Sequence, residues 1–232
     1  MSIGRRVTRL EHRLTSANAT TRDLEAAVTL ATVSDLAALT VSPWLVKAAK
    51  RQLGRSRVRL GTVVGFPHGG QLLSVKAFEA SKALEQGASQ IDFVLNAGAL
   101  LSGDDDIVLN DMLAVIDMVH SALGVAGVIV EAETLPIDHL RRACRIAERA
   151  GADYVVTGPG SGTARTTIER TATLRDSVGP RVEVKAAGRL RTLDQLREAA
   201  AAGASLIATR LTGELARAGS EALRPAVAAA AS

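Results

Sequence analysis

The sequence is poor in aromatic residues, cysteine and long apolar runs, and each shortage excludes a class of protein. Phe, Trp and Tyr make up 2% of the 232 residues, so the core must be built from Ala, Val, Leu and Ile. Cys144 is the single cysteine, which excludes an intrachain disulfide, and with four scattered histidines it does not supply a zinc site. No stretch approaches the roughly 18 apolar residues of a membrane span. We therefore expect a cytoplasmic protein without membrane contact, metal or other cofactor.

A long basic run is also absent, although the formal net charge is +4. Arg and Lys alternate with Asp and Glu along the whole chain, which indicates an ordinary solvated surface. We expect no nucleic-acid partner. A mildly positive field would instead help an anionic small molecule to arrive.

Short apolar runs rich in β-branched residues alternate with longer helical runs. The helical runs include residues 21–31, 74–87, 105–123, 137–150 and 192–203. Eight strands are predicted between and around them, at Thr8–Arg13, Ala37–Val41, Val58–Phe66, Gln90–Asn96, Gly127–Ala132, Asp153–Thr157, Val182–Ala186 and Ser205–Thr209. Such alternation is typical of βαβ units and a parallel sheet.

Three Gly-Ala pairs repeat at the same place in this pattern, where a helical run ends and the next strand begins. They start at Gly87, Gly151 and Gly203, and a glycine there can adopt the left-handed conformation that ends a helix. The repetition favours one symmetric α/β domain over residues 1–232, a single (β/α)₈ (TIM) barrel with a terminal helix and an Ala-rich tail over about 213–232. An open, doubly wound sheet has the same periodicity, but eight strands favour closure.

Strand side chains alternate between two faces, so their parity predicts which polar groups enter the barrel. In the fourth strand the apolar residues should face the helices, which sends Asp92 and Asn96 inward. The same argument sends Ile129 and Glu131 inward from the fifth strand.

In the seventh strand, Val182, Val184 and Ala186 should face the helices, which sends Glu183, Lys185 and Ala187 inward. Asn96, Glu131 and Lys185 lie near strand carboxyl ends, where such barrels keep their active sites. Buried charges are costly unless paired, so these groups should contact one another or a ligand. The alternative is an ion pair that only fixes packing. His68, in a loop, is either a substrate contact or a histidine satisfied by the backbone.

Several motifs in register resemble the deoxyribose-phosphate aldolase family over nearly the whole chain. They are LEHRLTSANAT (10–20), VVGFPHGGQLLSVKAFEA (63–80), SQIDFVLNAGAL (89–100), VIVEAETL (128–135), GADYVVTGPGSG (151–162) and VEVKAAGRLRT (182–192). The resemblance implies a TIM barrel and cleavage of a carbon–carbon bond next to a carbonyl.

The resemblance also implies roles for individual residues. In the family a lysine on strand six forms an imine with the substrate carbonyl, a second lysine on strand seven tunes the first, and an aspartate on strand four moves protons. By motif, Asp92 matches the aspartate and Lys185 the strand-seven lysine. The imine-forming position is Val156, which has no amine. Standard cleavage of deoxyribose 5-phosphate is therefore not expected.

Other positions depart from the family pattern. Gly127 stands where a lysine usually precedes the strand-five motif, while Arg13 and Ser16 replace a threonine and a lysine of the opening motif.

The loops that would hold a phosphate are altered too. The seventh strand runs into KAAGRLRT, where Arg189 replaces a glycine, and Arg210 stands in the last loop. Gly188, Arg189, Arg210, Thr157 and His68 are candidates for holding the substrate or its phosphate. The two arginines either grip an anion or fill a pocket that no longer binds one.

Two hypotheses for function follow. The first is an aldolase-like enzyme acting on a small carbonyl compound, phosphorylated or not, with Asp92, Lys185, Glu131 and Asn96 as the catalytic set. It would carry out aldol-type, enolisation or cyclisation chemistry, either by an imine on Lys185 or by acid–base catalysis. The second is a non-catalytic relative that binds a ligand or serves as a scaffold. A homodimer is compatible with the exposed barrel ends and the terminal helix.

Overall fold

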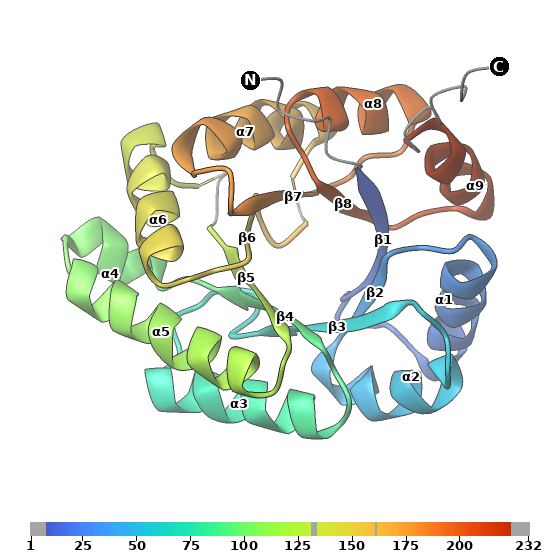
Figure 1. Cartoon of the computed structure of the whole chain (residues 1–232), viewed down its shortest axis with the longest axis horizontal. Helices are drawn as coiled ribbons and strands as arrows, with labels where there is room; N and C mark the ends of the chain where they lie inside the picture. Colours follow the sequence, from blue (N-terminus) through green and yellow to red (C-terminus); the bar gives the residue numbers. More distant parts are fainter. Residues whose placement is uncertain (1–7, 131–133, 161, 224–232) are drawn as a thin grey trace, which may run out of the picture.

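Eight parallel strands close into a barrel in the computed structural model, which describes residues 8–130, 134–160 and 162–223. Each strand pairs with its neighbours in chain order, and β8 returns to β1 (Figure 1). The strands are β1 (Arg9–Leu14), β2 (Ala38–Val41), β3 (Arg59–Val64), β4 (Gln90–Val94), β5 (Val125–Ile129), β6 (Tyr154–Val156), β7 (Glu183–Ala187) and β8 (Leu206–Thr209). The predicted (β/α)₈ barrel is confirmed.

The strand limits differ from the sequence-based ones by a few residues. β5 begins at Val125, two residues before the predicted start, and β3 and β4 end two residues before theirs. The residues beyond β4 leave the ladder because Asn96 caps a helix there. The predictions assigned each whole apolar run to a strand, whereas the ladder ends where the chain turns over the barrel rim.

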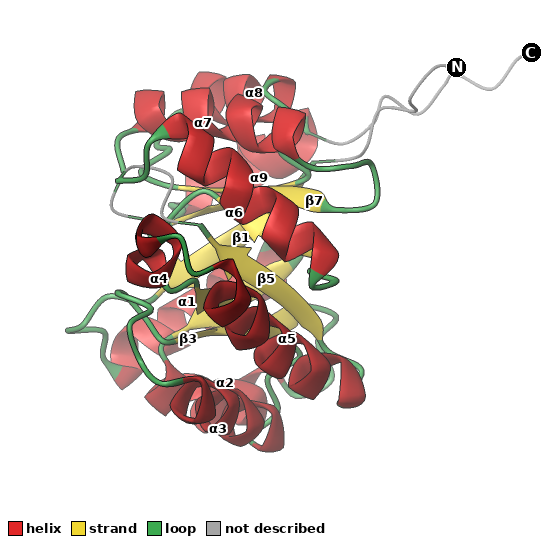
Figure 2. Ribbon diagram, turned by 90° about the vertical axis from the view of Figure 1, so that its left-hand side faces the viewer, coloured by secondary structure: helices red, strands yellow, loops and turns green. Residues whose placement is uncertain are grey.

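Helices surround the barrel and cover its outer face (Figures 1 and 2). They are α1 (Thr21–Val33), α2 (Val46–Leu53), α3 (Leu73–Glu85), α4 (Ala97–Ser102), α5 (Asp105–Ser121), α6 (Ile137–Arg149), α7 (Ala164–Ser177), α8 (Leu193–Ala201) and α9 (Gly213–Ala222), with a 3₁₀ turn η1 (Pro43–Leu45). Reciprocal capping boxes fix the starts of α1 and α8, through Thr20 with Asp23 and Thr192 with Gln195. No helix within the described ranges is long and apolar enough to cross a membrane.

The three repeated glycines adopt the predicted left-handed conformation. Their φ angles are 103° at Gly87, 86° at Gly151 and 102° at Gly203. Each lets the chain leave a helix and enter the next strand without the steric cost that a Cβ would meet there.

The strand faces divide as their parity predicts. Ile91 and Phe93 belong to the large apolar cluster between the strands and the helices. A second cluster lies inside the barrel and consists of Val94, Ile129, Tyr154, Val156, Ala187 and Ala208. The same inward face of the strands carries Asp92 and Lys185, so the interior is aliphatic around a small charged centre.

Candidate active site

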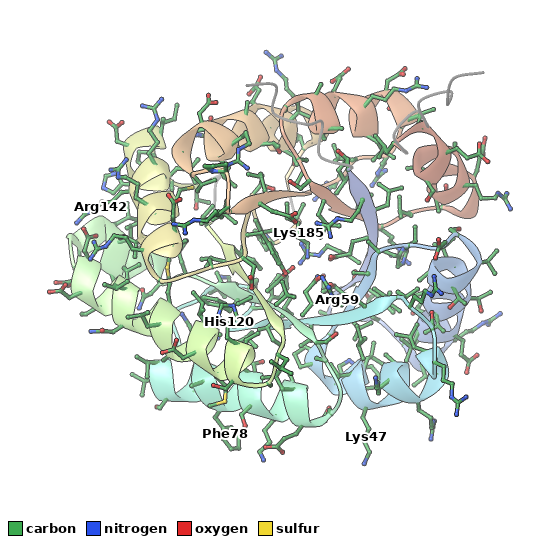
Figure 3. The ribbon with its side chains drawn as sticks, in the orientation of Figure 1. Lys47, Arg59, Phe78, His120, Arg142 and Lys185 are labelled. Atoms are coloured by element: carbon green, nitrogen blue, oxygen red, sulfur yellow. The ribbon has the colours of Figure 1, made fainter. Side chains whose placement is uncertain are left out.

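The charged centre consists of one lysine between two carboxylates. Lys185 Nζ lies 2.7 Å from Asp92 Oδ2 and 2.7 Å from Glu11 Oε2, and all three side chains are completely buried. They come from β7, β4 and β1, so the contact joins strands far apart around the ring. Figure 3 shows Lys185 pointing into the middle of the barrel. Asp92 and Lys185 thus meet as expected, and Glu11 joins them.

Two neutral side chains donate hydrogen bonds to the carboxylates of this centre. Tyr154 Oη donates to Asp92 Oδ1 at 2.5 Å, and Gln90 Nε2 donates to Glu11 Oε2 at 2.8 Å. Burial raises the pKa of the Tyr154 hydroxyl well above its usual value, and the charges of Asp92 and Glu11 raise it further. Tyr154 is therefore a hydrogen-bond donor throughout the physiological pH range.

The glycine of β5 explains how a tyrosine fits inside the barrel. A Cβ built on Gly127 would lie 2.0 Å from Cε2 of the Tyr154 ring, so any larger residue there would displace the ring. Gly127 and Tyr154 are register partners on β5 and β6. The missing side chain at Gly127 thus makes room for an aromatic ring from the neighbouring strand.

Val156 faces the barrel interior beside this centre. It is the register partner of Lys185 on β7 and of Ile129 on β5, and it is completely buried. Its neighbours Val94, Ala187 and Ala208 are apolar too. The position expected to carry the imine-forming amine is therefore part of a hydrocarbon lining.

Lys185 itself is arranged as a cation. It donates a hydrogen bond to Asp92 Oδ2 and forms an ion pair with Glu11 Oε2, and its ammonium lies 5.2 Å from the centre of the Tyr154 ring. Attack on a carbonyl needs a free lone pair, so one of these ion pairs would first have to be given up. The geometry suits a fixed positive charge better than a nucleophile.

Glu183 and Asn96 make other contacts. Glu183 faces inward, but it lies at the amino end of β7 and pairs with Arg9, so the carboxylates that meet Lys185 are Glu11 and Asp92 instead. Asn96 lies beyond β4, where its Oδ1 accepts from the backbone N–H of Ala99 at 3.0 Å and caps α4. Glu131 lies outside the described residues.

The candidate phosphate-binding residues surround the carboxyl ends of the strands. Arg189, Arg210 and His68 are exposed in the loops after β7, β8 and β3. Gly188 donates its N–H to Ala208 O at 3.3 Å. A Cβ on Gly188 would lie 2.1 Å from Thr167 Oγ1, so this glycine lets the loop after β7 approach α7.

Thr157 links two strands through its side chain. Its hydroxyl donates to Ala187 O at 3.1 Å and accepts from Ala187 N at 2.9 Å. Both bonds hold the end of β6 against β7, so Thr157 fixes the relative positions of Val156 and Lys185.

A second buried lysine also anchors the barrel rim. Lys76 on α3 donates to the Val94 carbonyl at 2.9 Å and to Asp111 Oδ2 on α5 at 2.6 Å. The pair ties two helices to the end of β4. Sequence reasoning passed over Lys76 because its neighbours Val75 and Phe78 made the run look like an ordinary amphipathic helix.

His12 is a structural residue. Its side chain is 5% exposed, and its Nδ1 accepts from the backbone N–H of Leu211 at 3.2 Å. Burial, reinforced by the nearby charge of Arg210, lowers the pKa of His12 from 6.5 to about 4. The imidazole therefore stays neutral in the folded protein well below the pH at which an unfolded chain would protonate it.

This shift predicts a loss of stability in mild acid. The unfolded state takes up a proton below about pH 6.5 and the folded state only near pH 4, so stability falls as the pH decreases through this window. Between about pH 7 and 4.5, His12 should account for about 2 to 3 kcal/mol of the lost free energy of unfolding. Urea unfolding of the wild type and of His12→Gln at both pH values measures this contribution to the free energy of unfolding. An equal loss in the two proteins would contradict the shift.

A cavity of about 360 Å³ opens at the opposite end of the barrel. The first residue of every strand lines it, and Arg57 and Arg181 extend its rim. Tyr154 and Gln90 form its inner wall, so they separate this cavity from Lys185. Among the described residues no group of His, Cys, Asp or Glu side chains could hold a metal ion.

Comparison with known proteins places this geometry in a family. A family model for the DeoC/LacD aldolases matches residues 8–224. The chain belongs to the DeoC/LacD aldolase family. A deoxyribose-phosphate aldolase of Thermococcus gammatolerans is 42% identical over 174 residues, covering 74% of this chain and 77% of the relative.

Solved structures of the family agree in fold. The aldolase QR15 superimposes with a TM-score of 0.80 at 27% identity, covering 96% of both chains. The tetrameric deoxyribose phosphate aldolase of Aeropyrum pernix superimposes with a TM-score of 0.77 at 27% identity, covering 93% of this chain and 89% of that one. In this chain, Val156, Gly127 and Arg13 occupy inward-facing strand positions.

Proposed function

We propose that this chain is a lyase of the DeoC/LacD family that acts on a small carbonyl compound by acid–base catalysis, without an imine on strand six. The observation that carries the proposal is Val156, a hydrocarbon side chain in register with Lys185. The fixed ammonium of Lys185 then replaces the electron-withdrawing role of a protonated imine.

The chemistry follows from the contacts of Asp92. This carboxylate is the base: it takes a proton from the substrate hydroxyl or from the carbon next to the carbonyl. The electron pair released by that proton, or by the broken carbon–carbon bond, moves onto the carbonyl oxygen as an enolate. Lys185 stabilises the enolate by its charge, and Tyr154 keeps Asp92 oriented through the hydrogen bond to Oδ1. Glu131, two residues after β5 in the sequence, stays a candidate for returning the proton, and Asn96 for orienting the substrate.

The substrate end that does not react would lie at the loops. Arg189 and Arg210 are exposed beyond β7 and β8, where a phosphate could take bidentate guanidinium contacts. Gly188, Thr157 and His68 are the remaining candidates for that role. The relatives named deoxyribose-phosphate aldolase suggest a phosphorylated sugar-like compound, whereas Val156 argues against their substrate being cleaved by the same mechanism.

A second candidate is a binding protein that has lost catalysis. The complete burial of Lys185, Asp92 and Glu11 favours it, because ion pairs of this kind also occur as packing elements. Self-association is compatible with either function, since Leu72, Val75 and Phe78 are exposed apolar residues at the start of α3. Figure 3 shows Phe78 pointing away from the barrel.

The experiment that separates the two candidates is carbonyl α-proton exchange in deuterium oxide, followed by proton NMR. Acetaldehyde, pyruvate, dihydroxyacetone phosphate and deoxyribose 5-phosphate serve as probes, with heat-denatured protein as the blank. The lyase proposal predicts that at least one probe loses its α-proton signal about 100-fold faster than the blank or more, as expected for general-base catalysis. A panel that exchanges no faster than the blank favours the binding protein.

A further inference from the structure

The buried polar atoms without partners gather on two neighbouring strands of the barrel. Within the described ranges, the unpartnered side-chain atoms of the barrel interior are Glu11 Oε1, all three guanidinium nitrogens of Arg13 and Thr40 Oγ1. Glu11 and Thr40 are completely buried and Arg13 is 6% exposed. Leaving such groups without hydrogen bonds is costly, and a guanidinium is the costliest of them. Their concentration in one place indicates a site for a polar ligand.

Arg13 and Thr40 lie one step nearer the carboxyl end of the barrel than Glu11, which contacts Lys185. Arg13 lies two residues beyond Glu11 on the same inward face of β1, one step nearer the carboxyl end, and Thr40 is its register partner on β2. The step between Glu11 and Arg13 is about 7 Å along a strand. Glu11 in turn contacts Lys185. A short molecule bound to Arg13 would therefore reach the charged centre with its other end.

The guanidinium of Arg13 also lies beside a glycine of the opposite wall. Nη1 would be 3.6 Å from a Cβ built on Gly160, in the loop between β6 and α7. Gly160 has a φ of 96° and no side chain that would keep the Arg13 guanidinium away from the loop backbone. The side chain of Arg13 thus extends from β1 to the loop after the strand that carries Val156.

We propose that Arg13, with Thr40 and Glu11, binds the carboxylate and oxo group of a short 2-oxo acid. The planar guanidinium matches a carboxylate with two parallel hydrogen bonds. The Thr40 hydroxyl donates to the oxo group on the side of the Lys185 ammonium, which stabilises the enolate, and Glu11 Oε1 accepts from a hydroxyl further along the substrate. The inference rests on the proposed function, because it names the substrate class of the same site.

The test measures ligand-induced stabilisation and does not depend on turnover. The wild type, Arg13→Met and Arg13→Lys are unfolded thermally in the presence of pyruvate, inorganic phosphate or, for ionic strength, chloride. Arg59→Met is the matched control, since Arg59 lies on the inward face at the opposite mouth of the barrel and is exposed. Arg13→Lys keeps the positive charge but loses the planar guanidinium. This variant therefore provides the comparison if Arg13→Met does not fold.

Pyruvate should raise the unfolding temperature of the wild type and of Arg59→Met alike. Both Arg13 variants lack the planar guanidinium, so their apparent affinity for pyruvate should be weaker than that of the wild type by roughly tenfold or more. Stabilisation by phosphate alone would overturn the assignment of an oxo acid. Equal stabilisation of all four proteins, or of none, would overturn a ligand role for Arg13 and leave it as a counter-charge for the chain's own carboxylates. Arg13-dependent binding without α-proton exchange would leave this inference standing while the lyase proposal fails.

Discussion

Replacement of Lys185 by methionine is expected to destabilise the protein by about 3 to 5 kcal/mol near neutral pH. The variant keeps the length of the side chain but leaves Glu11 and Asp92 completely buried without a cation. Urea unfolding of the variant and the wild type near neutral pH measures the difference in the free energy of unfolding.

Two further variants make this expectation specific. Lys82→Met breaks an ion pair with Glu85 on the surface of α3, where both side chains are about half exposed, and should cost less than about 1 kcal/mol. Combining Glu11→Gln, Asp92→Asn and Lys185→Met should recover most of the stability, because no buried charge then lacks a partner. A Lys185→Met protein as stable as the wild type at neutral pH would show that the three charges do not interact as described.

Replacement of Asp92 by asparagine is expected to lower the rate of carbonyl α-proton exchange by about 100- to 10,000-fold. Asparagine has the same shape, and its single carbonyl oxygen can still accept from Lys185 while the Tyr154 hydroxyl turns to accept from the amide N–H, but it cannot take the substrate's proton. The effect should therefore fall on the rate and not on folding, which circular dichroism can check. The comparison uses whichever probe the wild type exchanges fastest.

Asp153→Asn is the matched control for this change. Asp153 is an aspartate at the amino end of the barrel, where it accepts from the Ala126 N–H at 2.7 Å and lies 2.9 Å from His120 Nε2. The same chemical change there should leave the exchange rate unaltered. If both variants lost activity equally, or if Asp92→Asn kept the wild-type rate, Asp92 would not be the base.

The sequence predicted the barrel well because the signals for it are local and repeated. Each Gly-Ala pair that ends a helix, such as Gly87, needs only its own turn to adopt the left-handed conformation. The alternation in β4 and β7 likewise fixed the inward orientation of Asp92 and Lys185, since a strand has only two faces.

Strand parity could not predict height along the barrel axis. Glu183 and Lys185 share a face, yet one lies at the rim with Arg9 and the other in the middle with Asp92. Parity gave the face of Glu183 but did not identify Arg9 as its partner. The register between strands that are distant in sequence decides which charges meet, and the sequence does not contain it explicitly.

Glu11 and Tyr154 were missed for a different reason. The first strand reads RLEHRL, with charged or polar residues on both faces, so its periodicity does not tell which face is inward. Tyr154 begins a strand of three residues, too short to show a pattern. A signal was present in Gly127, whose missing side chain makes the room that the tyrosine ring fills.

The most direct test of the mechanism is borohydride trapping of an imine, read by intact mass and peptide mapping. The wild type and Val156→Lys would be incubated side by side with acetaldehyde and pyruvate and then reduced. The account predicts no adduct on the wild type and a reduced adduct on residue 156 of the variant, which places an amine in register with Lys185. A reduced adduct on Lys185 of the wild type, absent from Lys185→Met, would contradict acid–base catalysis and show that imine chemistry has moved to strand seven.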